Sequence, residues 1–385
     1  MTTYQALDAI AHATRLHQAG LDLELQRYMS QLSGEGIDEI KPWLGQLSLR
    51  AVEFSHASLP ASVYHRCEGW RAYFQGRYID AHECFQASLS QRDWQTFAYD
   101  VALGMAKVYT RSGHWQSAQK WALYYLSLAR SLRDDFGLTK GYGALAEIYL
   151  RGCQPQASLA CFQIANQLMP LGQGQLDKQY NFLASALMRN QEWLRAETLL
   201  RNSIKMSTDK MDRHPDDFSA KISYLHGWSR LSYLCLAKQQ ALSLPDSITA
   251  MIEELACGQL AFALHVPTGF ILVARAIESL RHHQTAAASS DLSLALSAFS
   301  HAAAMEYQWV LRLREALLGH VESGFTVYEP CQQLLEIQPV ATPDMTIVVD
   351  QTWAKVVLSD TGYQQLTTAQ ESITSLTEMW RLFFI

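Results

Sequence analysis

The sequence predicts an all-α protein built from stacked helix pairs. The stretch from Gly69 to Ser203 repeats one spacing of small and bulky residues four times, and each copy has the apolar periodicity of helices. Hydrophobic residues make up 49% of the chain and charged residues 18%, so there is enough apolar material for a continuous core. A compact helical protein is therefore expected, and a disordered chain is not.

Each copy reads as a first helix, a turn and a second helix. Positions four and then three residues apart carry the pattern in the second helix: Ala81/Phe85/Ser88, Ala118/Ala122/Tyr125, Ser158/Phe162/Ala165 and Ala196/Leu200/Ser203. Nine residues earlier the first helix supplies Ala72, Tyr109, Tyr149 and Leu187, and the turn holds Gly76, Gly113, Cys153 and Gln191. Small residues let two helices cross closely, a bulky residue fills the gap, and glycine suits the chain reversal.

This pattern resembles the tetratricopeptide repeat (TPR). The copies start 37, 40 and 38 residues apart, counted from Ala81, whereas the family repeats every ~34 residues. The Trp typical of the first helix is replaced by His65, Ala102, Tyr142 and Tyr180. The resemblance implies a right-handed α-α superhelix, a TPR-like solenoid with longer turns or helix ends, whose first helices line a concave groove.

Four parts are expected along the chain. They are a divergent N-terminal helical cap (1–60), four TPR-like repeats (61–206), divergent helical repeats (207–324) and a C-terminal cap (325–385). The cap is expected to hold helices over 3–18 and 21–32 and a third beginning at Pro42. The polar stretch Ser207–Asp217 contains Pro215 and is predicted to be a hinge or an exposed loop.

The divergent part is expected to contain helices over 218–240 and 245–264, a break at Pro267–Gly269, a further helix to His282 and a loop over 284–290. The repeat is predicted to resume with Ala295/Phe299/Ala302. In the C-terminal cap, the β-branched runs 346–349 and 355–358 favour a short β-hairpin, with a helix as the alternative. A final helix over 362–385 ends in aromatic residues that either cover the last helix pair or dock onto another surface.

Composition limits the class of partner and the compartment. A net charge of -6 and a pI near 6.1 argue against nucleic acid as the main partner. Seven scattered cysteines without a C-x-x-C pair favour reduced thiols and a cytoplasmic location. The N-terminus lacks the features of a signal peptide, and no apolar run approaches the ~18 residues of a membrane span. A protein without membrane insertion is expected.

Motifs that carry chemistry do not occur in the sequence. There is no phosphate-binding loop, no G-x-G-x-x-G after a strand, no H-E-x-x-H and no G-x-S-x-G. His82, Glu83 and Cys84 are ligand types, but adjacent helical residues point ~100° apart and do not share one ion. We therefore predict a protein that is not an enzyme, with no catalytic residue, cofactor or metal.

The TPR register, carried over from the resemblance, assigns thirteen residues to the concave groove. Seven are Lys or Arg, whereas two, Asp100 and Glu147, are acids; Ser185 is also among them. The residues predicted to bind a partner are Arg66, Trp70, Tyr73, Lys107, Arg111, Lys140, Arg151, Lys178, Asn181 and Arg189. The paired Lys and Asn of the family's carboxylate clamp are not reproduced, so recognition of a C-terminal Glu-Glu-Val-Asp tail is not predicted.

The predicted function is a non-catalytic adaptor or scaffold for protein–protein interaction. Long basic side chains around aromatic ones suit an acidic or amphipathic segment of a partner protein or peptide. The alternative is a regulatory sensor that responds to a small ligand or peptide and controls a partner's activity. A solvated basic face without any ligand is the third reading. Apolar surface at either end of a solenoid is also compatible with a homodimer.

Overall fold

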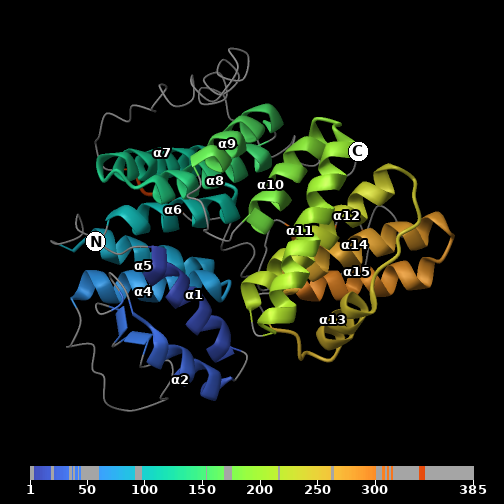
Figure 1. Ribbon diagram of the computed structural model, residues 1–385, viewed down its shortest axis with the longest axis horizontal. Helices are drawn as coiled ribbons and strands as arrows, with labels where there is room; N and C mark the ends of the chain where they lie inside the picture. Colours follow the sequence, from blue (N-terminus) through green and yellow to red (C-terminus); the bar gives the residue numbers. More distant parts are fainter. Residues whose placement is uncertain are drawn as a thin grey trace.

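The protein is all-helical in the computed structural model (Figure 1). The structure describes residues 4–18, 21–33, 60–91, 98–152, 154–168, 176–215, 217–261, 264–300 and 338–342, with isolated residues in 37–44 and 306–314. These residues contain no strand. The helices are α1 (Tyr4–Gln18), α2 (Asp22–Gln31), α4 (Ala61–Phe74), α5 (Tyr78–Leu89), α6 (Ala98–Ser112), α7 (Trp115–Ser131), α8 (Asp135–Arg151), α9 (Pro155–Leu168), α10 (Leu176–Arg189), α11 (Trp193–Arg213), α12 (Phe218–Ala237), α13 (Asp246–Ala256), α14 (His265–Arg281) and α15 (Thr285–Phe299). The predicted all-α class is confirmed for this part of the chain.

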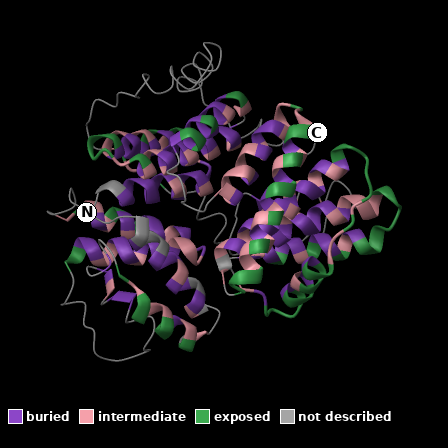
Figure 2. Ribbon diagram, viewed as in Figure 1, coloured by how far each residue is buried: buried purple, intermediate pink, exposed green. Residues whose placement is uncertain are grey.

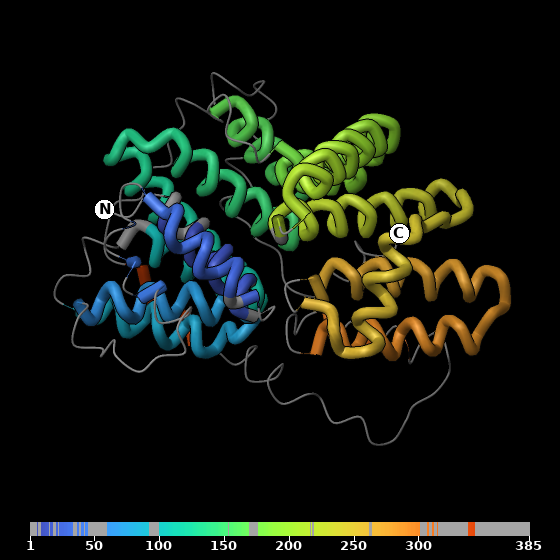
Figure 3. The backbone as a smooth tube through the Cα atoms, turned by 60° about the horizontal axis from the view of Figure 1, so that its bottom comes forward, coloured from blue at the N-terminus to red at the C-terminus, as the bar shows by residue number. Residues whose placement is uncertain are grey.

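Helices α4 to α11 pack as four consecutive pairs. Each second helix also packs against the first helix of the next pair, and the first helices α4, α6, α8, α10 and α12 contact one another in that order. Helix α1, which lies beside α4 in Figure 3, also contacts α12, so it links the first and the last helix of this series. Buried residues run between the pairs, and exposed residues gather on the outer turns and on α13 (Figure 2).

The turn inside each pair has the same hydrogen bond at the positions that the sequence aligned. A main-chain N–H donates to the carbonyl five residues earlier in Arg77–Ala72 (2.9 Å), His114–Tyr109 (3.0 Å), Gln154–Tyr149 (2.8 Å) and Glu192–Leu187 (2.9 Å). Such a bond ends a helix through one residue in the left-handed conformation. Gly76, Gly113 and Gln191 have this conformation, with φ of 76°, 80° and 63°. The repeated turn was therefore predictable from spacing alone.

The core of each pair is formed by the predicted triplets, whose members are all buried. Phe85 shows why small residues surround them. Its ring lies between Gly69 of α4 and Gly104 of α6, where an added Cβ would stand 2.6 Å and 2.5 Å from ring carbons. Glycine at both positions lets one aromatic ring connect two successive pairs.

The predicted loop over Ser207–Asp217 is wrong, because α11 continues as a helix to Arg213. Ser207 is buried and its hydroxyl donates to Asp177 Oδ2 of α10 (3.3 Å), while Lys210 Nζ donates to Asp177 Oδ1 (2.6 Å). These contacts with α10 keep a polar sequence helical. The helix ends at Arg213, and the chain turns at Pro215.

Three boundaries of the divergent part also differ from the prediction. Helix α13 ends at Ala256, near Gly258 with φ 69°, rather than continuing to Leu264. Helix α14 begins at His265, so Pro267 lies in its first turn, where a missing N–H is tolerated, and does not break a helix. The predicted loop 284–290 is helical from Thr285, because it is rich in alanine, a strong helix former.

The turn between α14 and α15 also resets the predicted register of the last pair. Gln284 N–H donates to Ser279 O (2.8 Å) and His283 has φ 58°, as in the earlier turns. Counting from this turn, the triplet is Ala288/Leu292/Ala295, all fully buried. In the predicted triplet Ala295/Phe299/Ala302, Ala295 and Phe299 are also fully buried, and Ala302 lies outside the described residues. In the N-terminal cap, Ile37 and Ile40 are already helical before Pro42, the predicted start. The predicted β-hairpin and final helix lie outside the described residues.

Candidate functional site

The candidate site lies on the surface that α6, α8, α10 and α12 share, here called the first-helix face. These four helices contact one another in sequence order. Residues four apart on a helix lie on the same side, so Lys107 and Arg111 of α6 share one side, as do Glu147 and Arg151 of α8. The repeated turns place Arg111, Arg151 and Arg189 at the same position of successive first helices.

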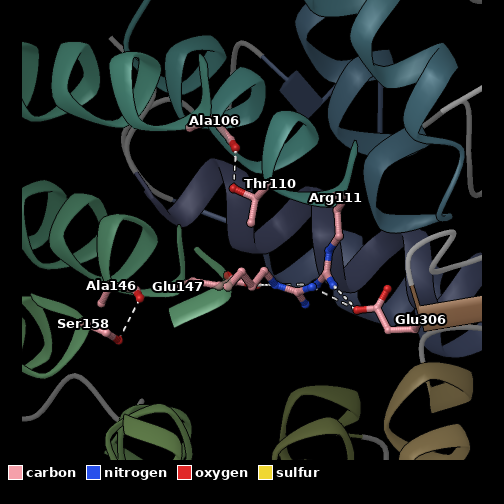
Figure 4. Close-up of polar contacts among 8 residues, drawn as sticks. Ala106, Thr110, Arg111, Ala146, Glu147, Ser158 and Glu306 are labelled. Atoms are coloured by element: carbon pink, nitrogen blue, oxygen red, sulfur yellow. Dashed lines mark hydrogen bonds and ion pairs between the residues drawn. The ribbon is translucent and has the colours of Figure 1, made fainter. Parts of the chain in front are cut away.

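Two arginines and two glutamates alternate at the centre of this face and form the central ionic cluster: Arg111, Glu147, Arg151 and Glu306 (Figure 4). Arg151 Nη1 lies 3.0 Å from Glu306 Oε1, and Arg151 Nε lies 3.4 Å from Glu147 Oε1. Arg111 lies 3.9 Å from the same oxygen of each glutamate. Each carboxylate therefore stands between two guanidinium groups.

The cluster is largely shielded from water. The exposed fractions of the side chains are 22% for Arg111, 17% for Glu147, 15% for Arg151 and 6% for Glu306. Burial alone would raise the pKa of Glu147, but Arg111, Arg151 and Lys107 lower it to about 2. Burial likewise opposes ionisation of Glu306, and Arg151 and Arg111 outweigh it, so its pKa is also lowered. Both carboxylates are charged at neutral pH.

Helix α12 borders the cluster with His226 and Arg230, which lie one turn apart. Arg230 Nε donates to Ser185 Oγ of α10, Nη1 donates to His226 O (3.1 Å), and the guanidinium lies 5.4 Å from the Phe182 ring centre. Burial lowers the pKa of Arg230 to about 10. Burial and the charges of Arg230 and Arg111 hold the pKa of His226 well below its usual range. Arg230 is therefore a cation at neutral pH, and His226 is uncharged.

Positive charge exceeds negative charge at this place. Four cations surround the two carboxylates: Lys107, Arg111, Arg151 and Arg230. With Glu147 and Glu306 ionised, these six groups carry a net charge of two positive units. A charge in a partly buried place attracts ions of opposite sign more strongly than it does in bulk water. Among these groups, an anion is electrostatically favoured over a cation.

The structure brings together some of the residues that the sequence predicted and separates others. Lys107, Arg111 and Arg151 belong to the cluster or its border, and Arg189 has the equivalent place on α10, half-buried. Tyr73 is half-buried beside Tyr78, at a ring distance of 5.4 Å, and both tyrosines interact electrostatically with Arg111.

Five predicted residues have other surroundings. Arg66 is fully buried, with Nε 3.5 Å from Asp100 Oδ2, and Trp70 packs against Phe74 and Phe85. Asn181 is buried and donates to the carbonyl of Ser223 (2.8 Å). The half-buried Lys140 places its ammonium 5.0 Å from the Phe136 ring centre, and Lys178 is half-buried on α10. Contact of any of the ten residues with a partner stays a prediction.

Sequence reasoning missed Glu306, His226 and Arg230. All three follow residue 206, where the repeat register could not be assigned from the sequence. Two signals were present. His226 and Arg230 lie four residues apart in a helix whose other charged residue is Lys221, and Glu306 is a lone acid after Ala-Ala-Ala-Met. A lone charge in an apolar run indicates a buried partner.

Other kinds of site find little support in the described residues. They contain no group of three or more His, Cys, Asp or Glu that could hold a metal ion, and none of their helices is long and apolar enough to span a bilayer. Burial, and then Glu68, raise the pKa of the Cys84 thiol to about 11, which makes it a weak nucleophile. Comparison with protein-family models, curated proteins and solved structures gives no match for this chain.

Proposed function

We propose that the chain is a TPR-like solenoid that acts as a non-catalytic adaptor and binds an acidic or amphipathic segment of a partner protein on the first-helix face. The repeated turns, the buried triplets and the ordered contacts of the first helices support the solenoid. The excess of two positive charges around the central ionic cluster is the observation that carries the binding proposal.

Glu306 indicates what kind of group this face accepts. It comes from a part of the chain 155 residues away from Arg151, yet its carboxylate lies between Arg111 and Arg151. Glu147 holds the same two guanidinium groups from the other side, so they are oriented before a ligand arrives. Charge-assisted bonds from arginine to carboxylate are stronger than neutral ones. A carboxylate of a partner would use Lys107 and Arg230 first and then Arg111 and Arg151.

The test is binding of a fluorescein-labelled, helix-forming peptide of Glu and Leu, measured by anisotropy at low salt. Replacing Lys107 and Arg230 together by Gln is expected to weaken binding at least about tenfold, or ~1.4 kcal/mol. Arg195→Gln with Arg201→Gln is the matched control, because these side chains are 68% and 63% exposed on α11. Equal weakening by both pairs, or equal binding of a Lys/Leu peptide, would rule out a specific anionic site.

A second candidate is a peptide-responsive regulator, and Glu306 favours it specifically. Since the chain's own carboxylate already contacts both arginines, an acidic ligand that replaces it would change the contacts of the region around residue 306. A partner's activity could then respond to ligand. A regulator of this kind should gain several degrees in Tm with the Glu/Leu peptide, because the ligand binds only the native state. An unchanged Tm at saturating peptide would argue against it.

A further inference from the structure

Residues 338–342 cross helices α6 and α7 and are held at Val340. The Val340 N–H donates to Tyr109 Oη (2.7 Å), and Trp121 Nε1 donates to the Val340 carbonyl (3.0 Å). Tyr109 belongs to α6 and Trp121 to α7, and they precede Val340 by 231 and 219 residues. Figure 1 shows this segment in orange-red beside the two helices. Both polar groups of one residue's main chain are therefore bound by side chains.

The surroundings of the Tyr109 hydroxyl favour acceptance of a hydrogen bond from a main-chain N–H. Its ring is fully buried, and its hydroxyl lies 3.0 Å from His82 Nε2. The hydroxyl accepts from Val340, and in the His82 tautomer whose Nε2 carries no proton it donates its own proton to that nitrogen. Burial and the nearby His114 lower the pKa of His82, which keeps its ring neutral and able to accept. In that tautomer His82 orients the tyrosine proton.

The contact is concentrated at a single residue. Val340 is half-buried against the core, whereas Gln338, Pro339 and Ala341 are exposed. Pro339 restricts φ and favours an extended chain before it. Main-chain bonds are independent of side-chain identity, so Tyr109 and Trp121 select an extended backbone and the apolar surface beneath selects the side chain.

Loss of the segment would leave polar groups without partners in a buried place. Trp121 is 1% exposed, and its N–H would have no acceptor once the Val340 carbonyl departed. An unpaired buried donor is costly, so replacement by another main chain is favoured over an empty site. A tethered segment competes at a high effective concentration, which a partner segment has to overcome.

We propose that Tyr109, Trp121 and His82 form a peptide-binding site that accepts an extended partner segment containing Pro followed by a β-branched residue, and that residues 338–342 are its resident ligand. The site is distinct from the central ionic cluster. Tyr109 and Arg111 lie two positions apart on α6 and therefore point ~200° apart. The proposal does not depend on the binding of acidic segments.

The experiment uses the full chain and a fluorescein-labelled peptide with the sequence of residues 336–344, Glu-Ile-Gln-Pro-Val-Ala-Thr-Pro-Asp. Val340→Pro removes the N–H that Tyr109 accepts and weakens the resident ligand. This variant is expected to bind the peptide at least about tenfold more tightly than the unchanged chain, because the tethered competitor is weakened. Val340→Gly keeps both main-chain groups, is expected to give an intermediate gain, and covers the case in which the proline variant does not fold.

Two controls distinguish binding at a specific site from non-specific binding. N-methylation of the peptide's valine removes one hydrogen bond and is expected to weaken binding to the Val340 variants about three- to tenfold. Adding Trp121→Phe, which keeps an aromatic ring without the N–H, is expected to act similarly. The proposal would be overturned if the folded Val340 variants bound the peptide no more tightly than the unchanged chain, or if N-methylation did not change the affinity. Residues 338–342 would then be a fixed structural segment.

Discussion

Helices α4 to α11 are here called the regular region, and the part from α12 onward is called the later region. Both contain packed helix pairs, but they contribute different residues to the candidate sites. In the regular region each pair repeats the same turn, and its first helices carry the cations Lys107, Arg111 and Arg151. The later region has the same hydrogen bond and left-handed residue after α12, α13 and α14, and it supplies Glu306 and Val340, which contact α6 and its neighbours. The regular region thus forms the surface, and residues of the later region occupy part of it.

The strongest test of this comparison concerns glycines that face an aromatic ring. Gly104→Ala is expected to destabilise the fold by about 1–3 kcal/mol, because Phe85 is held between Gly69 and Gly104 and has no room to move. Gly269→Ala in the later region should cost less, since an added Cβ would meet Phe299 at 2.8 Å rather than 2.5 Å. Gly143→Ala is the control, with nothing within 4 Å, and should be neutral or stabilising by up to ~1 kcal/mol. Urea unfolding measures all three, and equal losses would contradict close packing around Phe85.

Acid should weaken the central ionic cluster. The lowered pKa of Glu147, about 2, stabilises the fold fully above the unfolded value near 4.5, and this stabilisation is lost as pH falls toward 2. Glu147→Gln should therefore reduce the difference in unfolding free energy between pH 5 and pH 3. Hydrogen bonds from Lys238 and Arg201 also lower the pKa of Glu197, but these two partners are 31% and 63% exposed and are screened by water and salt, so Glu197→Gln should change that difference less. An equal change in both variants would show that the cluster is no more shielded than the surface.

The smallest expected effect compares the turns of the two regions. Gln191 and His283 adopt the left-handed conformation that glycine adopts in Gly76 and Gly113. Replacing either by Gly should stabilise the fold by roughly 0.5–1 kcal/mol, because the strain of a side chain at positive φ outweighs the added flexibility of the unfolded chain. Thermal unfolding of the two variants should give similar gains. A gain at Gln191 with a loss at His283 would show that the later turn is not the same structure.

The parts of the fold that depend on local spacing could be predicted from the sequence. The turns after Ala72, Tyr109, Tyr149 and Leu187 are examples, because a helix pair is closed by residues within about ten positions of one another. Charge alone was a weaker guide. Arg66 was assigned to a binding surface, whereas it is buried beside Asp100 of the next pair, and a sequence pattern does not distinguish a paired arginine from a solvated one.

Contacts between distant residues could not be predicted. Glu306 lies in a segment without the repeat spacing, and its partner Arg151 is 155 residues away. The loop prediction for residues 207–213 was wrong for a related reason. Asp177 on another helix accepts hydrogen bonds from Ser207 and Lys210 and keeps this stretch helical. In each case the deciding group is remote in sequence, where periodicity contains no information.

The great distance along the chain between α6 and Val340 has a consequence for biosynthesis. Local helix pairs close soon after they leave the ribosome, whereas a contact that spans 219 residues waits until the later residue has been made. At ordinary elongation rates that delay is roughly 10–45 s. For this period Tyr109 and Trp121 lack their resident segment, so if the proposed peptide-binding site forms early, a nascent chain would be open to another polypeptide before its own residues 338–342 have been translated.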